Sequence, residues 1–392
     1  MKRTVWVTGL GIFSAIGTDA GSFWDALSEG RSGVGELTRF PAGDMRCPRV
    51  FECPDPGGPC INRADNLALR GAREALAQAG LVRLPEGAGI ALGAGVGGLP
   101  ETETFYLGVP VPGRLAGGLR VLANHMPSTT ADVLGAEFGG GGARISVANA
   151  CTSSAVAIGM AGLWIASGMC ECVLAGASDA LSRLTVGGFN ALRVVSPDRP
   201  KPFDRDRSGM VIGEGAAFMV LESPESARAR GAPPLATLDG VGLSADAFHA
   251  TAPQPEGEGA LRAILRALEM AGMGPECVDH VNAHGTATPS NDAAEAKALL
   301  ALLGDRASQV PVTSIKGAVG HCLGAAGAIE AAASVLSLVN QRIPPCAGFA
   351  DSDPSIPLWV PREALSMPLG HVLSVNLAFG GNNAALLFGR AP

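Results

Sequence analysis

One cysteine in the sequence lies in a setting that suits a nucleophile. Cys151 is part of the segment Asn-Ala-Cys-Thr-Ser-Ser-Ala, between a short β-rich run and an apolar run with helical spacing. At the start of a helix, the positive helix end favours thiolate over thiol, and free N–H groups can bind an oxyanion. The alternative is a small buried thiol, as most cysteines are. Nucleophilic catalysis by the cysteine is the chemistry that this setting supports.

Two histidines stand at the ends of predicted strands, where α/β proteins place catalytic groups. His284 opens the segment His-Gly-Thr-Ala-Thr-Pro, and His321 lies in Lys-Gly-Ala-Val-Gly-His-Cys-Leu-Gly. A cysteine with one histidine would fit a hydrolase or an acyltransferase. Two histidines fit a reaction that must also stabilise an enolate oxygen.

Strands alternate with helices along the whole chain, which is typical of an α/β fold. The first part is predicted to contain strands at 5–8, 90–92, 145–148, 172–175 and 216–221, and helices at 64–80 and 152–167. The charged stretch 222–234 contains Pro and Gly and predicts a boundary, which divides the chain into residues 1–230 and 231–392. The second part is predicted to contain helices at 259–271, 293–303 and 325–340, and strands at 280–283, 312–315, 373–376 and 384–388. The similar patterns suggest an internal duplication.

Composition excludes several classes of function. Of the 392 residues, 47% are hydrophobic and 17% charged, so the chain can form a large core and an extensive subunit interface. The net charge of −7 argues against a nucleic-acid partner. No membrane span is expected, because the most apolar stretch, 323–339, has Glu330 in its middle and is predicted to be a buried helix. Nine cysteines, an odd number, favour free thiols in the reducing cytoplasm.

Cofactor and metal motifs lack their necessary partners. The segment 93–98 satisfies GxGxxG, but it is followed by Leu-Pro-Glu-Thr-Glu, a poor start for a helix. The acidic residue expected about 20 positions later is also missing, so a tight turn is predicted instead of a dinucleotide site. Cys47, Cys53 and Cys60 form no CxxC pair and have no nearby histidine, so no metal site is predicted.

Taken together, these motifs resemble the β-ketoacyl-acyl carrier protein synthases that use a Cys-His-His triad. The resemblance runs from Val7-Thr-Gly-Leu-Gly11 to Phe379-Gly-Gly-Asn-Asn383 and includes 202–204 and 213–216. It implies a thiolase-like fold, in which two similar α/β halves form a five-layer α-β-α-β-α sandwich. It also implies a condensing enzyme that takes an acyl chain from an acyl carrier protein and extends it by decarboxylative Claisen condensation with malonyl-acyl carrier protein. The pathway would be fatty-acid or specialised polyketide or polyene biosynthesis.

The resemblance implies a role for each residue of the reacting centre. Cys151 is similar to the acylated nucleophile. His284 and His321 are similar to the pair that promotes decarboxylation and holds the enolate. Phe379 matches the gating aromatic residue, whose backbone N–H would form an oxyanion hole with that of Cys151.

Other matches concern support of the site and delivery of the substrate. Lys316 matches the family's active-site lysine, and Glu330 matches an acidic residue of the substrate-binding region on the next helix. Thr286 and Thr288 match threonines that bind the phosphopantetheine arm. Because that arm belongs to the carrier, no permanently bound cofactor is expected. The family also implies a homodimer, or a heterodimer with a related ketosynthase-like subunit.

Two alternatives and one departure remain. A thiolase would need a second catalytic cysteine near the C-terminus, but the last one, Cys346, lies in Cys-Ala-Gly-Phe. The chain-length-determining partner subunit of a heterodimeric ketosynthase typically lacks the nucleophile that this chain retains. Leu377 and Ala378 precede Phe379 where the family usually has Phe-Gly, which should alter the freedom of the gate loop.

An acidic carrier would have to dock on a local basic patch, since the chain itself is negatively charged. Clustering in the sequence offers two groups, of which we favour the second: Arg63 with Arg70, and Arg199, Lys201, Arg205 and Arg207.

Overall fold

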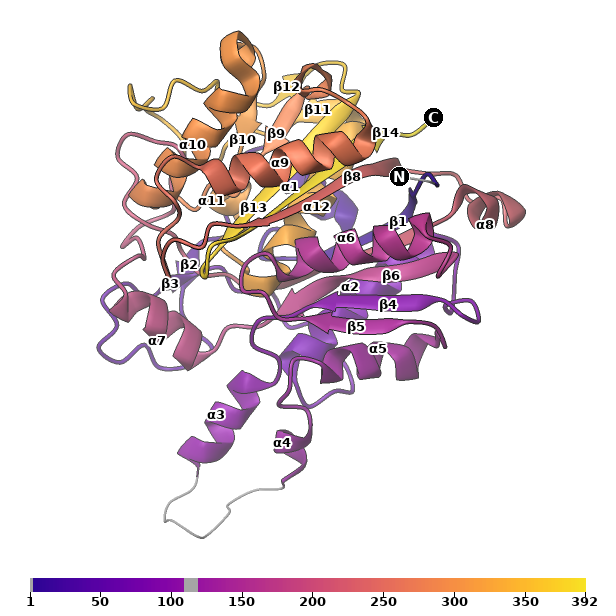
Figure 1. The fold of residues 1–392 in the computed structure, drawn as a ribbon. Helices are drawn as coiled ribbons and strands as arrows, with labels where there is room; N and C mark the ends of the chain where they lie inside the picture. The colour runs from indigo at the N-terminus through magenta and orange to yellow at the C-terminus, as the bar shows by residue number, and fades with distance from the viewer. Residues whose placement is uncertain (1–2, 109–118) are drawn as a thin grey trace.

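The computed structural model describes residues 3–108 and 119–392 and confirms the predicted α/β fold (Figure 1). The first half supplies five strands to the main sheet: β1 (Trp6–Phe13), β4 (Gly89–Gly93), β5 (Arg144–Val147), β6 (Cys172–Asp179) and β7 (Gly215–Glu222). Its helices are α1 (Ala20–Ser28), α2 (Arg63–Gln78), α3 (Leu99–Leu107), α4 (Arg120–Ala123), α5 (Thr129–Phe138), α6 (Ser153–Ala166), α7 (Arg183–Ala191) and α8 (Pro224–Ala229).

The second half supplies the other five strands: β8 (Ala236–Ala245), β9 (His280–Asn282), β10 (Val312–Thr313), β13 (His371–Ala378) and β14 (Asn382–Arg390). Its helices are α9 (Glu258–Ala271), α10 (Pro289–Leu303), α11 (Lys316–Val319) and α12 (Ala326–Asn340), and the 3₁₀ turn η3 (Leu323–Ala325) precedes α12. Two small sheets pair β2 (Gly35–Glu36) with β3 (Arg49–Val50), and β11 (Arg342–Ile343) with β12 (Leu365–Ser366).

Both halves use the same strand topology. The strands follow one another as β10-β9-β13-β14-β8-β1-β7-β6-β4-β5. Counted along the chain, each half therefore places its third, second, fourth, fifth and first strands side by side. In each half the second strand is parallel to the third and fourth, whereas the fifth is antiparallel to its two neighbours. This shared order supports the internal duplication suggested by the sequence.

Helices and strands alternate in five layers. Helix α2 covers one face of the first set of strands and α6 the opposite face, while α9 covers the outer face of β8 and β14. Helix α12 packs between the two sets, against α6, β7 and β13. The central core joins apolar side chains of both sets of strands to α6 and α12. This arrangement is the predicted α-β-α-β-α sandwich.

The apolar segment predicted to be a buried helix lies in that central layer. The helical stretch Leu323–Asn340 is long and apolar enough to span a bilayer, but 89% of it is buried within the fold. Burial between the two sets of strands explains its apolar character on every side.

Several elements were absent from the sequence-based prediction, among them strand β8 and helices α1, α3, α5 and α7. Strand β8 was missed because glycines interrupt its apolar pattern. They are needed there, since a Cβ at Gly240 would lie 2.1 Å from the carbonyl oxygen of Ala267 in α9. Helix α3 begins directly after the glycine-rich segment 93–98, so the expectation of a poor helix start was wrong. Pro100 lies in the first turn, where a missing N–H costs no helical hydrogen bond.

Candidate active site

The nucleophile candidate lies on a sharp turn between β5 and α6. Ala150, directly before Cys151, has a left-handed backbone with φ +49°. The side chain of Ser153 accepts a hydrogen bond from the Asn149 N–H at 2.8 Å and donates one to the Ala150 carbonyl at 2.6 Å, which stabilises the turn. Helix α6 begins at Ser153, two residues after the cysteine rather than at it. The turn places Cys151 at the carboxyl end of β5, beside the N-terminus of α6.

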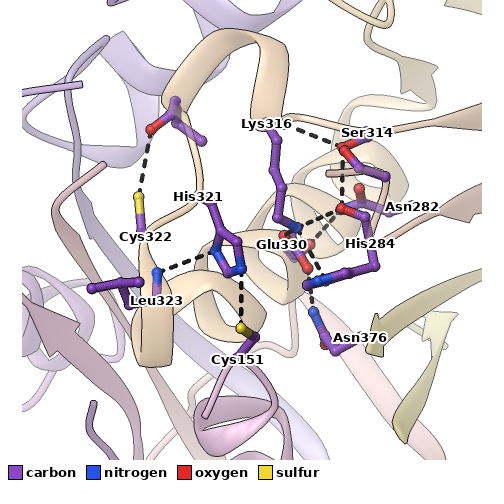
Figure 2. Close-up of polar contacts among 12 residues, drawn as sticks. Cys151, Asn282, His284, Ser314, Lys316, His321, Cys322, Leu323, Glu330 and Asn376 are labelled. Atoms are coloured by element: carbon purple, nitrogen blue, oxygen red, sulfur yellow. Dashed lines mark hydrogen bonds and ion pairs between the residues drawn. The ribbon is translucent and has the colours of Figure 1, made fainter. Parts of the chain in front are cut away.

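Cys151, His284 and His321 come together in the interior (Figure 2). The Nε2 atom of His321 is 3.0 Å from Sγ of Cys151. The two histidine rings are edge-to-face, with centroids 5.3 Å apart. One side-chain N or S atom from each of the three residues lies within 4.8 Å of the others. Exposed fractions of 7%, 3% and 1%, in chain order, show that the group is shielded from solvent.

The backbone determines which nitrogen of His321 carries the proton. The Leu323 N–H donates to Nδ1 of His321 at 3.2 Å (Figure 2). Burial and the nearby Lys316 hold the pKa of this histidine well below its usual range, so the ring is neutral. A neutral ring that accepts at Nδ1 carries its proton on Nε2, the atom that faces Cys151.

A lysine holds His284 in the same way. Lys316 Nζ lies 3.2 Å from Nδ1 of His284 and donates to the His284 carbonyl at 2.6 Å. Burial first, then Lys316 and His321, lower the pKa of His284 well below its usual value. An ammonium group can only donate, so Nδ1 is the acceptor and the proton is on Nε2.

Glu330 and Asn376 complete this support. Glu330 forms a buried ion pair with Lys316 and accepts a hydrogen bond from Asn376 (Figure 2). Burial raises the pKa of Glu330 to about 7, while Lys316 opposes that shift. The pair therefore depends on both partners, because either charge alone would be buried without compensation.

Burial changes the expected ionisation of the cysteine. It raises the pKa of Cys151 to about 11, although Lys316 and the N–H groups of Phe379 and Cys151 act to lower it. The helix end was expected to favour thiolate over thiol, but desolvation has the larger effect and keeps the resting group a thiol. The two backbone N–H groups nevertheless act on the sulfur and lower its pKa, which is the influence that would also stabilise an oxyanion formed there.

A cleft of about 340 Å³ leads to the cysteine and both histidines. Thr286 and Thr288 line it, and their hydroxyl oxygens are 2.9 Å apart. Phe379 and Phe189 line the same cleft, and the centroids of their rings are 5.6 Å apart. Glu330 was predicted with the substrate-binding residues. Its side chain instead contacts Lys316 and Asn376, and it is not among the described residues that line the cleft.

Sequence reasoning missed two carboxylates that hold the His284 loop. Glu295 accepts hydrogen bonds from the backbone N–H groups of His284 and Gly285 at 2.7 and 2.8 Å. Asp292 accepts hydrogen bonds from the backbone N–H groups of Phe203 at 2.8 Å and Ala287 at 3.1 Å. It therefore connects the segment 202–204 to the loop that carries Thr286 and Thr288. Acidic residues near a helix start, directly after a loop that carries a histidine, were the available signal.

Two of the basic residues predicted to dock a carrier are already paired. Arg63 donates to the buried Glu214, and 12% of its side chain is exposed. Arg207 pairs with Asp353 at 2.6 Å, and 8% of its side chain is exposed. Arg205 lies near Asp206 and Asp351, at 3.6 and 3.9 Å, but 58% of its side chain is exposed. Arg63 and Arg207 are therefore structural, which corrects the sequence-based grouping.

Comparison with known proteins places this geometry in a family. The N-terminal domain model of beta-ketoacyl synthase matches residues 2–227, and the C-terminal domain model matches residues 235–350. The 3-oxoacyl-[acyl-carrier-protein] synthase 2 of Synechocystis sp. is 36% identical over 99% of this chain and 98% of its own length.

Two solved structures cover the whole chain. The ishigamide ketosynthase/chain length factor matches over 100% of both chains, with a TM-score of 0.94 and 34% identity. The second structure is a type II PKS acyl-carrier protein in complex with its ketosynthase bound to the hexaketide. One chain of this complex matches over 100% of both chains, with a TM-score of 0.91 and 27% identity. These likenesses confirm the predicted thiolase-like fold. With both family models matched in order and the similarity extending from end to end, the chain belongs to the beta-ketoacyl synthase family.

Proposed function

We propose that the protein is a 3-oxoacyl-[acyl-carrier-protein] synthase, which loads an acyl chain onto Cys151 and extends it with malonyl-acyl carrier protein. One observation carries this proposal. Both histidines accept a hydrogen bond at Nδ1, so both carry their proton on Nε2; His321 Nε2 is 3.0 Å from the buried sulfur, and a ring nitrogen of His284 lies within 4.8 Å of it. Two neutral donors next to a nucleophile suit a reaction that forms an enolate, which simple thioester hydrolysis does not need.

The first half-reaction transfers the acyl group. Cys151 Sγ attacks the thioester carbonyl of the acyl-carrier, and the new C–S bond converts the carbonyl oxygen into an oxyanion. The N–H groups of Cys151 and Phe379 stabilise that oxyanion. Collapse of the intermediate breaks the C–S bond to phosphopantetheine, whose sulfur leaves with the proton that the cysteine gives up.

The second half-reaction forms the new carbon–carbon bond. The malonyl thioester loses CO₂, and the electron pair of the broken bond gives an enolate. The Nε2–H groups of His284 and His321 donate to the enolate oxygen. Its carbon then attacks the acyl group on Cys151, and the C–S bond breaks to release a 3-oxoacyl-carrier and the Cys151 thiolate. The thiolate takes up one proton from solvent to restore the thiol.

Lys316 and Glu330 act on this reaction through His284. The ammonium group holds His284 by both Nδ1 and its carbonyl oxygen, and Glu330 balances the lysine charge. We therefore assign them as positioning residues, and we assign substrate binding in the cleft to Thr286 and Thr288. Phosphopantetheine enters as part of the substrate, and its arm would lie along this cleft.

Partners and location follow the same proposal. The similar structures include an acyl-carrier protein and a chain length factor, which supports a carrier as one partner. They also support a second subunit, either a copy of this chain or a related one. All nine cysteines are free, which supports the cytoplasm as the location. We retain residues 1–230 and 231–392 as the two halves that carry the nucleophile and the histidines.

Intact-protein mass spectrometry with a panel of acyl-carriers tests the proposal and identifies the preferred chain. Wild-type protein should gain one acyl mass, and Cys151→Ala should gain none. Cys60→Ala, which removes a partly exposed thiol elsewhere, should acylate normally. An acyl group on the Cys151→Ala variant, or no 3-oxoacyl product from the acylated wild type with malonyl-carrier, would refute the function.

A further inference from the structure

Asp179, at the end of β6, holds two loops together from inside the fold. Its Oδ1 accepts hydrogen bonds from the backbone N–H groups of Gly95 and Val96 at 3.1 and 2.9 Å. Its Oδ2 accepts from the N–H of Gly324 at 2.7 Å. The side chain is fully buried, and among residues 3–108 and 119–392 no lysine, arginine or histidine pairs with it. All the hydrogen-bond partners recorded for this carboxylate are backbone N–H groups.

The two loops fit closely around the carboxylate. A Cβ at Gly95 would lie 2.6 Å from Oδ2 of Asp179, and one at Gly324 would lie 2.7 Å from the same oxygen. The Gly324 Cβ would also lie 2.6 Å from the Gly95 nitrogen. The glycine-rich segment 93–98, which imitates a dinucleotide motif, therefore packs closely against Asp179 and against the loop after His321.

Leu323 connects this contact to the histidine. Its backbone is left-handed, with φ +52°, a conformation that strains a residue with a side chain. The dihedral angles of Leu323 set the relative directions of two N–H groups, its own and that of Gly324. The first donates to Nδ1 of His321 and the second to Asp179. A strained residue keeps such a conformation only where its surroundings hold it.

We propose that Asp179 is a positioning residue for His321, which holds Leu323 in the left-handed conformation and so keeps the histidine proton on Nε2. Without the carboxylate, Leu323 can relax and turn its N–H away from Nδ1. The proton could then move to Nδ1, and Nε2 would no longer donate toward the reacting atoms. The first half of the chain thus controls the tautomer of a histidine in the second half. The kinetic consequence rests on the proposed function of His321.

The test reads the tautomer directly. Protein labelled with ¹⁵N at its six histidines gives a long-range ¹H–¹⁵N spectrum that distinguishes the two neutral tautomers. The His321→Ala spectrum assigns the His321 signals. Wild type should show His321 with its proton on Nε2, and Asp179→Asn should show a mixture or the Nδ1 form. Malonyl-carrier decarboxylation should fall by about 10- to 100-fold, since one oriented donor is lost.

Two further variants make the result decisive. Glu74→Gln is the matched control, because Glu74 likewise accepts two backbone N–H bonds, from Ile12 and Ala20, but away from the site. It should leave the His321 signals unchanged. Asp179→Ser removes the carboxylate and leaves room for a water molecule, and it replaces the Asn variant if that one does not fold.

Each outcome decides the inference. An unchanged His321 tautomer in a folded Asp179 variant would overturn it, as would failure of both variants to fold, because Asp179 would then serve overall stability. A normal condensation rate in His321→Ala would instead refute the proposed role of His321, while the tautomer comparison would still decide the role of Asp179.

Discussion

His321 Nε2 lies 3.0 Å from Cys151 Sγ, although 170 residues separate the two in the chain. The cysteine follows β5 of the first half, whereas the histidine precedes η3 of the second half. The site therefore forms only when the two halves pack on each other across α6 and α12. A direct bond crosses the same junction, since Ser154 Oγ accepts from the Ala328 N–H at 2.8 Å.

Loss of either histidine should impair the second half-reaction more than the first, whereas loss of the nucleophile should abolish both. His284→Ala and His321→Ala should each retain at least part of the acyl transfer to Cys151, because the oxyanion donors are backbone N–H groups. Decarboxylation and condensation should fall by about 10²–10⁴-fold, since each variant loses one enolate donor. Intact mass measures acylation, and release of labelled CO₂ measures decarboxylation. A variant that condenses at nearly the wild-type rate would exclude its histidine from the mechanism.

The raised pKa of Cys151 predicts an unusual pH dependence for its alkylation. The thiolate is the reactive form, and burial raises the pKa of this thiol to about 11. The rate of alkylation by iodoacetamide should therefore rise about tenfold per pH unit through pH 9 and continue to rise above it. An ordinary thiol with a pKa near 8.5 would already level off there.

Mass spectrometry of alkylated peptides over pH 7–10 measures this rate for Cys151. A short model peptide with one cysteine provides the reference thiol, because burial also raises the pKa of Cys60. A plateau below pH 8 for Cys151 would show that the helix end and Lys316 outweigh burial, contrary to our assignment.

The buried Lys316–Glu330 pair should contribute differently to stability and to activity. Lys316→Met alone leaves the buried Glu330 without its cation and should destabilise the fold by about 3–5 kcal/mol. The double variant Lys316→Met, Glu330→Gln removes both charges and should recover most of that stability. It should not recover condensation, because Nδ1 of His284 no longer has its donor.

Chemical denaturation measures the stability of each variant, and the condensation assay measures its activity. If the double variant condenses normally, the lysine supports the fold only and does not orient His284.

The sequence predicted most of the fold and the reacting residues, because both follow local patterns. Strands and helices follow apolar periodicity, and the short segment around Cys151 is enough to place that cysteine before a helix. Strand β8 was missed because its glycines are required by close packing against α9, and a local sequence pattern does not show that packing. The roles of Asp179 and Glu295 were missed for the same reason, since their partners are backbone N–H groups of other loops.

Ionisation was also beyond the reach of local patterns. The sequence shows that Cys151 precedes a helix, which lowers a thiol pKa, but it does not show how deeply the sulfur is buried. Burial is a property of the complete fold and proves to be the larger effect. Likewise, the cluster that contains Arg205 and Arg207 looks uniform in sequence, yet only tertiary structure shows that Asp353 pairs with Arg207.

That difference between neighbouring arginines yields the prediction for carrier docking. Arg205 is 58% exposed, and Arg193 is an exposed residue that lines the cleft without an ion-pair partner among the described residues. Arg193→Glu and Arg205→Glu should raise KM for a carrier-bound substrate several-fold and leave a small pantetheine thioester unaffected, because only the acidic carrier meets the reversed charge.

Arg207→Glu is the matched control. It should lower the melting temperature, since it places a like charge beside Asp353 in a mostly buried position. Steady-state kinetics with both substrates and thermal melts separate the two effects. Equal changes of KM for carrier and pantetheine thioester would show that Arg193 and Arg205 act on the cleft itself and do not bind the carrier.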